Sequence, residues 1–500
     1  DTTDKALGER FSFWIKEISP NTAPYYQKLN LKLVNCPYLK ELDQEKYRIY
    51  LRSVNKQIDI FREENIPLFT IMEEKQQEYG AISAKMSIEV DGEKLTMQKA
   101  SLLLKSNDRN KREEIYNKIV SRRKEDEQTL DNLFDELIEL RQKIAKNAGF
   151  SNYRDYMFAA MGRFDYNPED CFNFHNAIEK EIVPIISTFE NSRKEKLGYT
   201  NYKPWDISVD DDGLSPLKPF DGGSELSDLS IECFNRLRPY FGECLSTMKE
   251  MKHLDLESKD GKAPGGFMYP LYEIGVPFIY MNAVGSQRDV VTMVHEGGHA
   301  VHSFLSRDLA ITEFKSTPSE VAELASMSME LLSMDHWDVF YSDDNELKRS
   351  KLEQLEKALE TLPWVAAIDK FQHWIYTTEH TAKERKEQWL KINSKLGNQV
   401  INWEGQENAL ANLWQKQLHL YEVPFYYIEY GMAQLVAIAM WRSYKELGEQ
   451  GLDNYMDALK LGYTKTIGEI YEKAGIKFDF SASYVKELAD FIKEELEKLG

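Results

Sequence analysis

Cysteine, positive charge and long apolar runs are all scarce in this sequence, and each shortage argues against a class of protein. Four cysteines in 500 residues, with no CxxC pair, argue against a disulfide framework and against a zinc ribbon. Free thiols in a reducing compartment are the remaining interpretation. The first residues, Asp1 to Arg10, lack the basic and apolar regions of a signal peptide. We therefore expect a cytoplasmic protein.

Positive charge is scarce relative to negative charge. Lys and Arg number 63 against 83 Asp and Glu, which gives a net charge of -20 at pH 7. A chain this acidic repels phosphate backbones, so nucleic acid is not an expected partner. The most apolar stretch, Gly431 to Trp441, is well short of the roughly 18 residues that a membrane span needs. With 42% hydrophobic and 29% charged residues, a soluble globular protein remains.

Glycine and proline are rare within the segments that repeat apolar residues three and four apart, as in Leu130, Leu133, Leu137 and Leu140. This period predicts a mainly α protein. One segment differs, because Tyr199 to Ser230 is rich in proline, glycine and aspartate. We expect a long irregular connection there.

A small β element is predicted before the most informative motif. Phe267 to Tyr272 and Pro277 to Asn282 are apolar and β-prone, with Glu273-Ile274-Gly275 between them. Ser286 and Asp289 then form the signature of a capping box, which starts a helix.

That helix contains His295-Glu296-Gly297-Gly298-His299. Residues four apart on a helix lie about 6 Å apart along the axis, so both imidazoles can face one cation. Glu296 lies about 100° around the helix, where it can reach a metal-held water without binding the metal. With nine histidines and 83 acidic residues, about 0.03 chance matches to this His-Glu-x-x-His pattern are expected in 500 residues.

His302 continues the same face but lies about 10.5 Å from His295 along the axis, so we expect a packed or supporting histidine rather than a ligand.

A third ligand is expected from the next helix, after Thr317-Pro318-Ser319-Glu320. This segment resembles a capping box with proline in the first turn, which gives Glu320 a structural role. Glu323 has no such role and stands in an apolar stretch, where its carboxylate needs a partner. A zinc ion supplies that partner, so Glu323 is the predicted ligand.

Near the C-terminus, the sequence around His419 is rich in tyrosine. If Pro424 starts a helix, Tyr427 and Tyr430 share one face. Aromatic stripes usually belong to a core, and that interpretation stays open. The alternative is that these phenols and the imidazole stabilise the oxyanion in a zinc hydrolase.

Taken together, HEGGH, PSEVAE with its last glutamate 24 residues after the second histidine, GVPFIYMN and HLYEVPFYYIEYG resemble the oligoendopeptidase F branch of the thimet oligopeptidase family of zinc metallopeptidases. The resemblance implies two largely helical lobes enclosing a deep channel, one zinc ion per chain and short peptides as substrates. By position, it assigns His295, His299 and Glu323 as metal ligands and Glu296 as the general base. It also assigns His419, Tyr427 and Tyr430 to substrate and transition-state contacts.

Two regions are expected from this resemblance. Residues 1–110 form an N-terminal helical region, shorter at its start than in typical members, and residues 111–500 form the zinc peptidase region. The leading hypothesis is an endo-acting oligopeptidase in which the strand around Phe278 to Met281 pairs with the substrate backbone. A dipeptidyl carboxypeptidase-type exopeptidase is the alternative within enzymes. A catalytically silent peptide-binding scaffold is a weaker alternative, because a closed structural zinc site has no use for Glu296.

Overall fold

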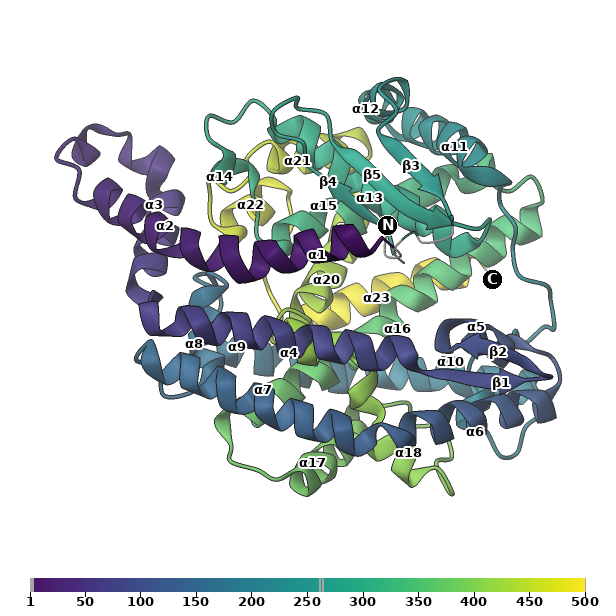
Figure 1. Cartoon of the computed structure of the whole chain (residues 1–500). Helices are drawn as coiled ribbons and strands as arrows, with labels where there is room; N and C mark the ends of the chain where they lie inside the picture. The colour runs from purple at the N-terminus through teal and green to yellow at the C-terminus, as the bar shows by residue number, and fades with distance from the viewer. Residues whose placement is uncertain (1–3, 260–261, 263–264, 500) are drawn as a thin grey trace.

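The computed structural model describes residues 4–259, 262 and 265–499, and it is mainly α-helical, as predicted (Figure 1). The first helices are α1 (Lys5–Phe13), α2 (Ser19–Val34), α3 (Gln44–Ile60), α4 (Ile66–Lys85), α5 (Met97–Leu102), α6 (Arg109–Glu125), α7 (Glu127–Asn147), α8 (Tyr153–Ala160), α9 (Pro168–Ala177), α10 (Val183–Lys196), α11 (Gly222–Leu237) and α12 (Pro239–Glu250). They continue with α13 (Gln287–Ser306), α14 (Thr312–Lys315), α15 (Ser319–Leu332), α16 (Asp344–Thr377), α17 (Ala382–Leu396), α18 (Glu407–Ala411), α19 (Leu418–Glu422), α20 (Ile428–Leu447), α21 (Glu449–Leu459), α22 (Ile467–Lys473) and α23 (Ala482–Leu499).

Two small sheets interrupt the helices. The strands are β1 (Ser87–Val90), β2 (Glu93–Thr96), β3 (Leu254–Glu257), β4 (Phe267–Tyr269) and β5 (Phe278–Ala283). The predicted pair is present as β4 and β5, which are antiparallel, and β3 adds to β5 in parallel to give the order β3-β5-β4. The hairpin β1-β2 was missed, although its turn residues Asp91 and Gly92 both have positive φ, as a two-residue hairpin turn requires.

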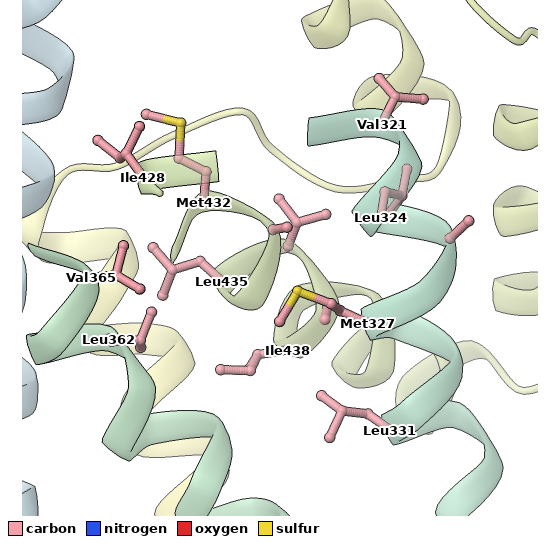
Figure 2. Packing of buried hydrophobic residues seen from close by; sticks show 14 of the residues in the cluster. Val321, Leu324, Met327, Leu331, Leu362, Val365, Ile428, Met432, Leu435 and Ile438 are labelled. Carbon is pink, nitrogen blue, oxygen red and sulfur yellow. The ribbon is translucent and has the colours of Figure 1, made fainter. Parts of the chain in front are cut away.

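The main core lies where α20 packs between α15 and α16. Figure 2 shows Leu324 and Leu331 of α15 on one side of Met432 and Leu435 of α20, with Val365 of α16 on the other. The named side chains of α15 are seven residues apart and those of α20 three apart, so each of these helices turns one apolar face toward its neighbours. The same helices carry the predicted third ligand and the predicted tyrosines, so core packing fixes their relative positions.

The two predicted regions share this core, because Leu68 and Tyr79 of α4 belong to the same buried cluster as α15 and α20. Figure 1 shows α13, α15 and the three-stranded sheet on one side of the molecule and α4, α6 and α7 on the other, with α16, α20 and α23 between them. The division at residue 110 stays a prediction. Among the described residues, no helix is both long and apolar enough to cross a membrane.

The predicted irregular connection is shorter than expected. Residues 207–221 are free of helix and strand, but Gly222–Leu237 form α11, so the expectation was wrong for 222–230. This helix buries Leu226, Cys233 and Phe234, which lie seven and eight residues apart on one face. The free energy of burying them outweighs the low helix propensity of the two glycines at its start.

Candidate active site

The HEGGH segment lies in the middle of α13, whose start is fixed as predicted. Ser286 is the N-cap and forms a capping box with Asp289, whose Oδ2 accepts hydrogen bonds from the Ser286 N–H (2.9 Å) and Oγ (2.8 Å). The rings of His295 and His299 lie on one face with centroids 4.9 Å apart. The helix therefore presents both imidazoles together, as the four-residue spacing predicts.

Two glycines bring α13 close to its neighbours. A Cβ on Gly298 would lie 2.6 Å from the Ala325 carbonyl oxygen of α15, and one on Gly297 would lie 2.7 Å from the Phe234 ring. Both distances are shorter than real Cβ contacts, so larger residues would push the helices apart. No role was predicted for either glycine. Gly298 allows α15 to approach within ligand distance of the histidines, and Gly297 allows Phe234 of α11 to pack against the same helix.

The predicted third ligand, Glu323, reaches the two histidines from α15. Its Oε2 lies 3.4 Å from His295 Nε2 and 3.9 Å from His299 Nε2, and one ligand atom from each residue lies within 4.8 Å of the others. Ligands at about 2.0–2.1 Å around a tetrahedral zinc lie about 3.4 Å apart. The three side chains thus fit the ligand set of a zinc ion and leave a fourth position open.

A carboxylate that the sequence analysis missed orients the first histidine. Glu330 Oε1 lies 2.7 Å from His295 Nδ1, and Glu330 Oε2 accepts a hydrogen bond of 2.8 Å from Gln354 of α16. With Nδ1 held by a carboxylate, Nε2 of His295 is free to bind a metal. Glu330 follows Glu323 by seven residues, two helical turns on the same face of α15, and that spacing is the signal that could have found it.

Removing this positioning residue gives a testable change in metal affinity. We expect Glu330→Ala to weaken zinc binding about 10- to 100-fold, because His295 loses the partner that fixes its ring. Competitive titration with a chromophoric chelator measures the affinity directly. Gln354→Met is the matched control, since it removes only the outer hydrogen bond. Equal zinc affinity in Glu330→Ala and the wild type would mean that packing alone holds His295.

The electrostatics of the site favour a bound cation. Burial alone lowers the pKa of His295, but the hydrogen bond that its ring donates to Glu330 and the charges of Glu323, Glu330 and Glu296 raise the pKa to about 9. Burial lowers the pKa of His299 to about 4, against the charge of Glu323. Three carboxylates surround two imidazoles, an excess of negative charge that a divalent cation would balance.

Glu296 has the environment of a general base. It is 6% exposed, and burial raises the pKa of its carboxyl to about 7, with further raising by Glu323 and lowering by His295 and the Met268 N–H of β4. A base works best when its pKa lies near the working pH. Glu296 is therefore suited to exchange a proton at neutral pH.

His302, by contrast, is a packed residue. It is buried, and its burial lowers the pKa of the imidazole to about 3. It does not belong to the cluster of ligand atoms formed by the described residues His295, His299 and Glu323. This agrees with the prediction that His302 lies too far along the helix axis from His295 to bind the same ion.

The structure brings the predicted tail residues together. The His419 ring lies 4.7 Å from that of Tyr427 and 5.9 Å from that of Tyr430, centroid to centroid. All three are partly buried, and Tyr426, outside the predicted set, joins them with its ring 5.3 Å from that of Tyr430.

The hydroxyls of these tyrosines have different neighbours. The charge of Glu323 contributes to the raised pKa of both Tyr426 and Tyr430, each of which is raised first by burial. Tyr427 instead hydrogen bonds with Trp364 and Gln417. The charge of Glu323 thus acts on the phenols of Tyr426 and Tyr430, whereas Tyr427 interacts with Trp364 and Gln417.

The prediction that Pro424 starts a helix was wrong. α20 begins at Ile428, and the preceding turn contains Phe425 in the left-handed region with φ 70°. The Phe425 N–H donates to Gln372 Oε1 (2.6 Å), and its carbonyl accepts from Arg163 Nη2. These buried contacts hold a backbone conformation that a non-glycine residue rarely adopts, and they fix the direction of Tyr426.

The predicted capping role of Glu320 was also wrong. α15 begins at Ser319 with Pro318 as its N-cap, without a side-chain cap. Glu320 is 2% exposed and accepts a hydrogen bond of 2.6 Å from the Tyr166 hydroxyl. A capping carboxylate must turn back to the backbone at an accessible helix end, and here burial against Tyr166 prevents that.

Fold and site together define a class: a mainly helical protein in which two histidines of one helix and a glutamate of the next could hold a metal ion. A sequence model of Peptidase family M3 matches residues 102–490, and the chain belongs to this family. The predicted oligoendopeptidase F branch is confirmed by similar proteins. An oligoendopeptidase F homolog of Borreliella burgdorferi is 25% identical over 386 residues, which cover 75% of this chain and 63% of that protein. Oligopeptidase PepF of Bacillus subtilis is 22% identical over 368 residues, covering 71% and 53%.

Solved structures extend the similarity to the whole chain. A structure described as PZ peptidase A with inhibitor 2 has a TM-score of 0.91 at 26% identity, and the match covers 100% of this chain and 88% of that one. Oligoendopeptidase F from Enterococcus faecium has a TM-score of 0.69 at 17% identity and covers 100% and 87%, which shows a shared fold. The chain spans less than two thirds of the length of the Borreliella relative.

Proposed function

We propose that this protein is a zinc-dependent oligoendopeptidase that hydrolyses internal bonds of short, unstructured peptides in the cytoplasm. The observation that carries the proposal is the joint geometry of His295, His299 and Glu323 with the buried Glu296 beside them. A scaffold protein would gain nothing from Glu296, because its carboxylate is buried at a cost and is not one of the three converging ligands. The enclosed channel between two lobes, which admits flexible peptides and excludes folded proteins, is part of this proposal.

The chain supplies both the proton transfers and the oxyanion donors. Zinc, when bound, lowers the pKa of water and polarises the scissile carbonyl. Glu296 takes a proton from the attacking water and later gives it to the leaving amine, for which a pKa of about 7 is suited in both directions. Tyr430, with Tyr426 beside it, donates an O–H to the oxyanion of the tetrahedral intermediate.

The strand proposed for substrate pairing needs correction. β5 is the central strand of the order β3-β5-β4, so the strand around Phe278 to Met281 is already paired on both sides. β3 and β4 are the two edge strands, and the Met268 N–H of β4 hydrogen bonds to Glu296. An extended peptide that adds to the edge of β4 would therefore lie beside the general base.

The hydroxyl of Tyr430 distinguishes two interpretations of the tyrosines, a role in catalysis and a role in the core. We expect Tyr430→Phe to lower kcat about 100-fold with little change in KM, because only a transition-state donor is removed. Tyr427→Phe is the matched control and should change kcat by less than about threefold, since its hydroxyl bonds to Trp364 and Gln417. Steady-state kinetics of the two variants suffice. A larger kcat loss in Tyr427→Phe than in Tyr430→Phe would mean that Tyr430 has a packing role and no role in catalysis.

A positive group near the site favours recognition of a substrate carboxylate. Lys416 Nζ lies 4.9 Å from the Trp364 ring, Trp364 donates to Gln417 (2.9 Å), and Gln417 Nε2 is 2.7 Å from His419 Nδ1. The Lys416 side chain is solvent-accessible, yet surrounding protein and the nearby Arg123 lower its pKa to about 8. This cation is the feature on which a dipeptidyl carboxypeptidase would rely.

Peptides with free and amidated C-termini distinguish the two enzymes. For an endopeptidase in which Lys416 aids binding, amidation should raise KM by about tenfold at most and leave the cleaved internal bond unchanged. Lys416→Met should remove this sensitivity to amidation. Mass spectrometry of the products identifies the bond. If amidated peptides are not cleaved and free ones lose C-terminal dipeptides, the exopeptidase is the correct function.

A further inference from the structure

Arg163, which has no assigned part in the reaction, makes buried contacts on both sides of Tyr426. Its Nη2 donates to the Phe425 carbonyl oxygen and, at 2.8 Å, to Oε1 of Glu429. Arg163 is 8% exposed and Glu429 is 4% exposed. Phe425 directly precedes Tyr426 in the chain. Glu429 directly precedes Tyr430 in the first turn of α20, so one nitrogen atom connects the two backbone segments that carry these phenols.

The Arg163 side chain makes no other hydrogen bond among the described residues. Its Nε and Nη1 are buried without a hydrogen-bond partner there. The guanidinium lies against the rings of Phe158 and Tyr166, with its central carbon 4.9 Å and 5.3 Å from the ring centroids. All the hydrogen bonds of this buried cation are thus made to the segment that carries the tyrosines.

A serine extends this network to a tyrosine hydroxyl. Burial raises the pKa of Glu429 to about 7, against the lowering effects of Arg163 and of a hydrogen bond with Ser319. Burial also raises the pKa of Tyr426, and a hydrogen bond with the same Ser319 side chain lowers it. Ser319 therefore connects the carboxylate that Arg163 holds to the phenol of Tyr426, which in turn interacts with the phenol of Tyr430.

A second buried side chain holds the same turn. Gln372 of α16 is fully buried, and its Oε1 accepts the Phe425 N–H at 2.6 Å. Side chains from two distant parts of the chain thus bind both the carbonyl and the N–H of Phe425. Because a non-glycine residue rarely adopts its φ of 70°, we expect the turn to relax and move Tyr426 when either contact is lost.

We propose that Arg163, together with Gln372, positions the hydroxyls of Tyr426 and Tyr430 for the oxyanion without touching the substrate. The inference rests on the proposed function, in which these phenols serve the tetrahedral intermediate. A donor stabilises the oxyanion only at hydrogen-bond distance, and a displacement of about 1 Å can lower the rate about 100-fold. Binding of the unreacted peptide does not depend on that distance, so loss of Arg163 should lower kcat and leave KM nearly unchanged.

Steady-state kinetics of the zinc-loaded, full-length protein test this role. Arg163→Met should lower kcat about 10- to 100-fold, with KM within about threefold of the wild type and zinc content unchanged. Arg112→Met is the matched control, because Arg112 is also buried and also binds a carboxylate (Asp206, 2.8 Å) and a carbonyl oxygen (Trp205, 3.0 Å).

The control arginine lies on α6, whose buried apolar residues belong to a separate small cluster. We expect Arg112→Met to lower the melting temperature, as Arg163→Met should, but to keep kcat within about threefold of the wild type. An equal loss of kcat in the two variants, or a wild-type kcat in Arg163→Met, would overturn the inference.

A combined variant distinguishes failure of this inference from failure of the proposed function. When Tyr426→Phe and Tyr430→Phe are both present, adding Arg163→Met should lower kcat by less than about threefold, because the hydroxyls that it positions are already absent. A further loss of 10- to 100-fold would overturn the inference alone. A wild-type kcat in the double phenylalanine variant would overturn the catalytic role of the tyrosines, and this inference with it.

Gln372→Met tests the same positioning if Arg163→Met does not fold. It removes only the acceptor of the Phe425 N–H. We expect kcat to fall with KM nearly unchanged, and this loss to disappear in the double phenylalanine variant. A wild-type kcat in Gln372→Met, or an undiminished loss in that background, would overturn the inference.

Discussion

Glu296→Gln should retain zinc and lose peptidase activity by about 10³- to 10⁴-fold. The amide has nearly the size of the carboxylate, so α13 and the ligands keep their positions, but it cannot take a proton at neutral pH. The wild-type carboxyl is suited to that task because burial raises its pKa to about 7. Zinc content and turnover, measured on one sample, show whether zinc is retained and whether activity is lost.

The control for this experiment is the thermal stability of the variant, which should stay near that of the wild type because Glu296 is not part of the metal cluster. Near-normal turnover in the zinc-loaded variant would remove Glu296 from the mechanism. Loss of zinc together with activity would instead make Glu296 a ligand.

Glu323→Ala should release zinc and abolish activity, with an affinity loss well beyond the 10- to 100-fold expected for Glu330→Ala. Glu323 contributes a ligand atom 3.4 Å from His295 Nε2, whereas Glu330 only orients that ring from its other nitrogen. Two imidazoles alone leave the ion bound by half of a tetrahedral set. Chelator competition with both variants and the wild type measures the three zinc affinities and so their order.

Glu320→Gln is the matched control, because Glu320 lies one helical turn before Glu323. Its carboxylate accepts from the Tyr166 hydroxyl at 2.6 Å, and the glutamine amide oxygen can accept the same bond. Zinc affinity should therefore stay within about threefold of the wild type. If Glu320→Gln released the metal and Glu323→Ala kept it, the third ligand would be one turn away from our assignment.

The sequence predicted those parts of the site that depend on spacing within one helix. His295 and His299 follow from a spacing of four, and the capping box of Ser286 and Asp289 follows from short-range hydrogen bonding. Glu323 was found because a carboxylate in an apolar stretch needs a partner. In each case the physical requirement acts between residues that are near one another in sequence.

The sequence did not predict features that arise only when helices pack. Gly298 allows α13 to approach α15, and nothing near it in sequence indicates that α15 is the neighbour. Glu320 fits the capping pattern, yet tertiary burial against Tyr166 outweighs it. The positive φ of Phe425 depends on Gln372 and Arg163, both more than 50 residues away, so the start of α20 and the direction of Tyr426 were missed.

The central claim is that a zinc ion at His295, His299 and Glu323 is required for cleavage of internal peptide bonds. The most direct test is mass spectrometry of a mixture of short peptides incubated with the protein, with its chelated form, and with that form after stoichiometric zinc is returned. We predict cleavage at internal bonds, its loss on chelation, and its recovery on zinc addition. Unchanged cleavage after the catalytic metal has been removed, or no cleavage by the zinc-loaded protein, would contradict the account.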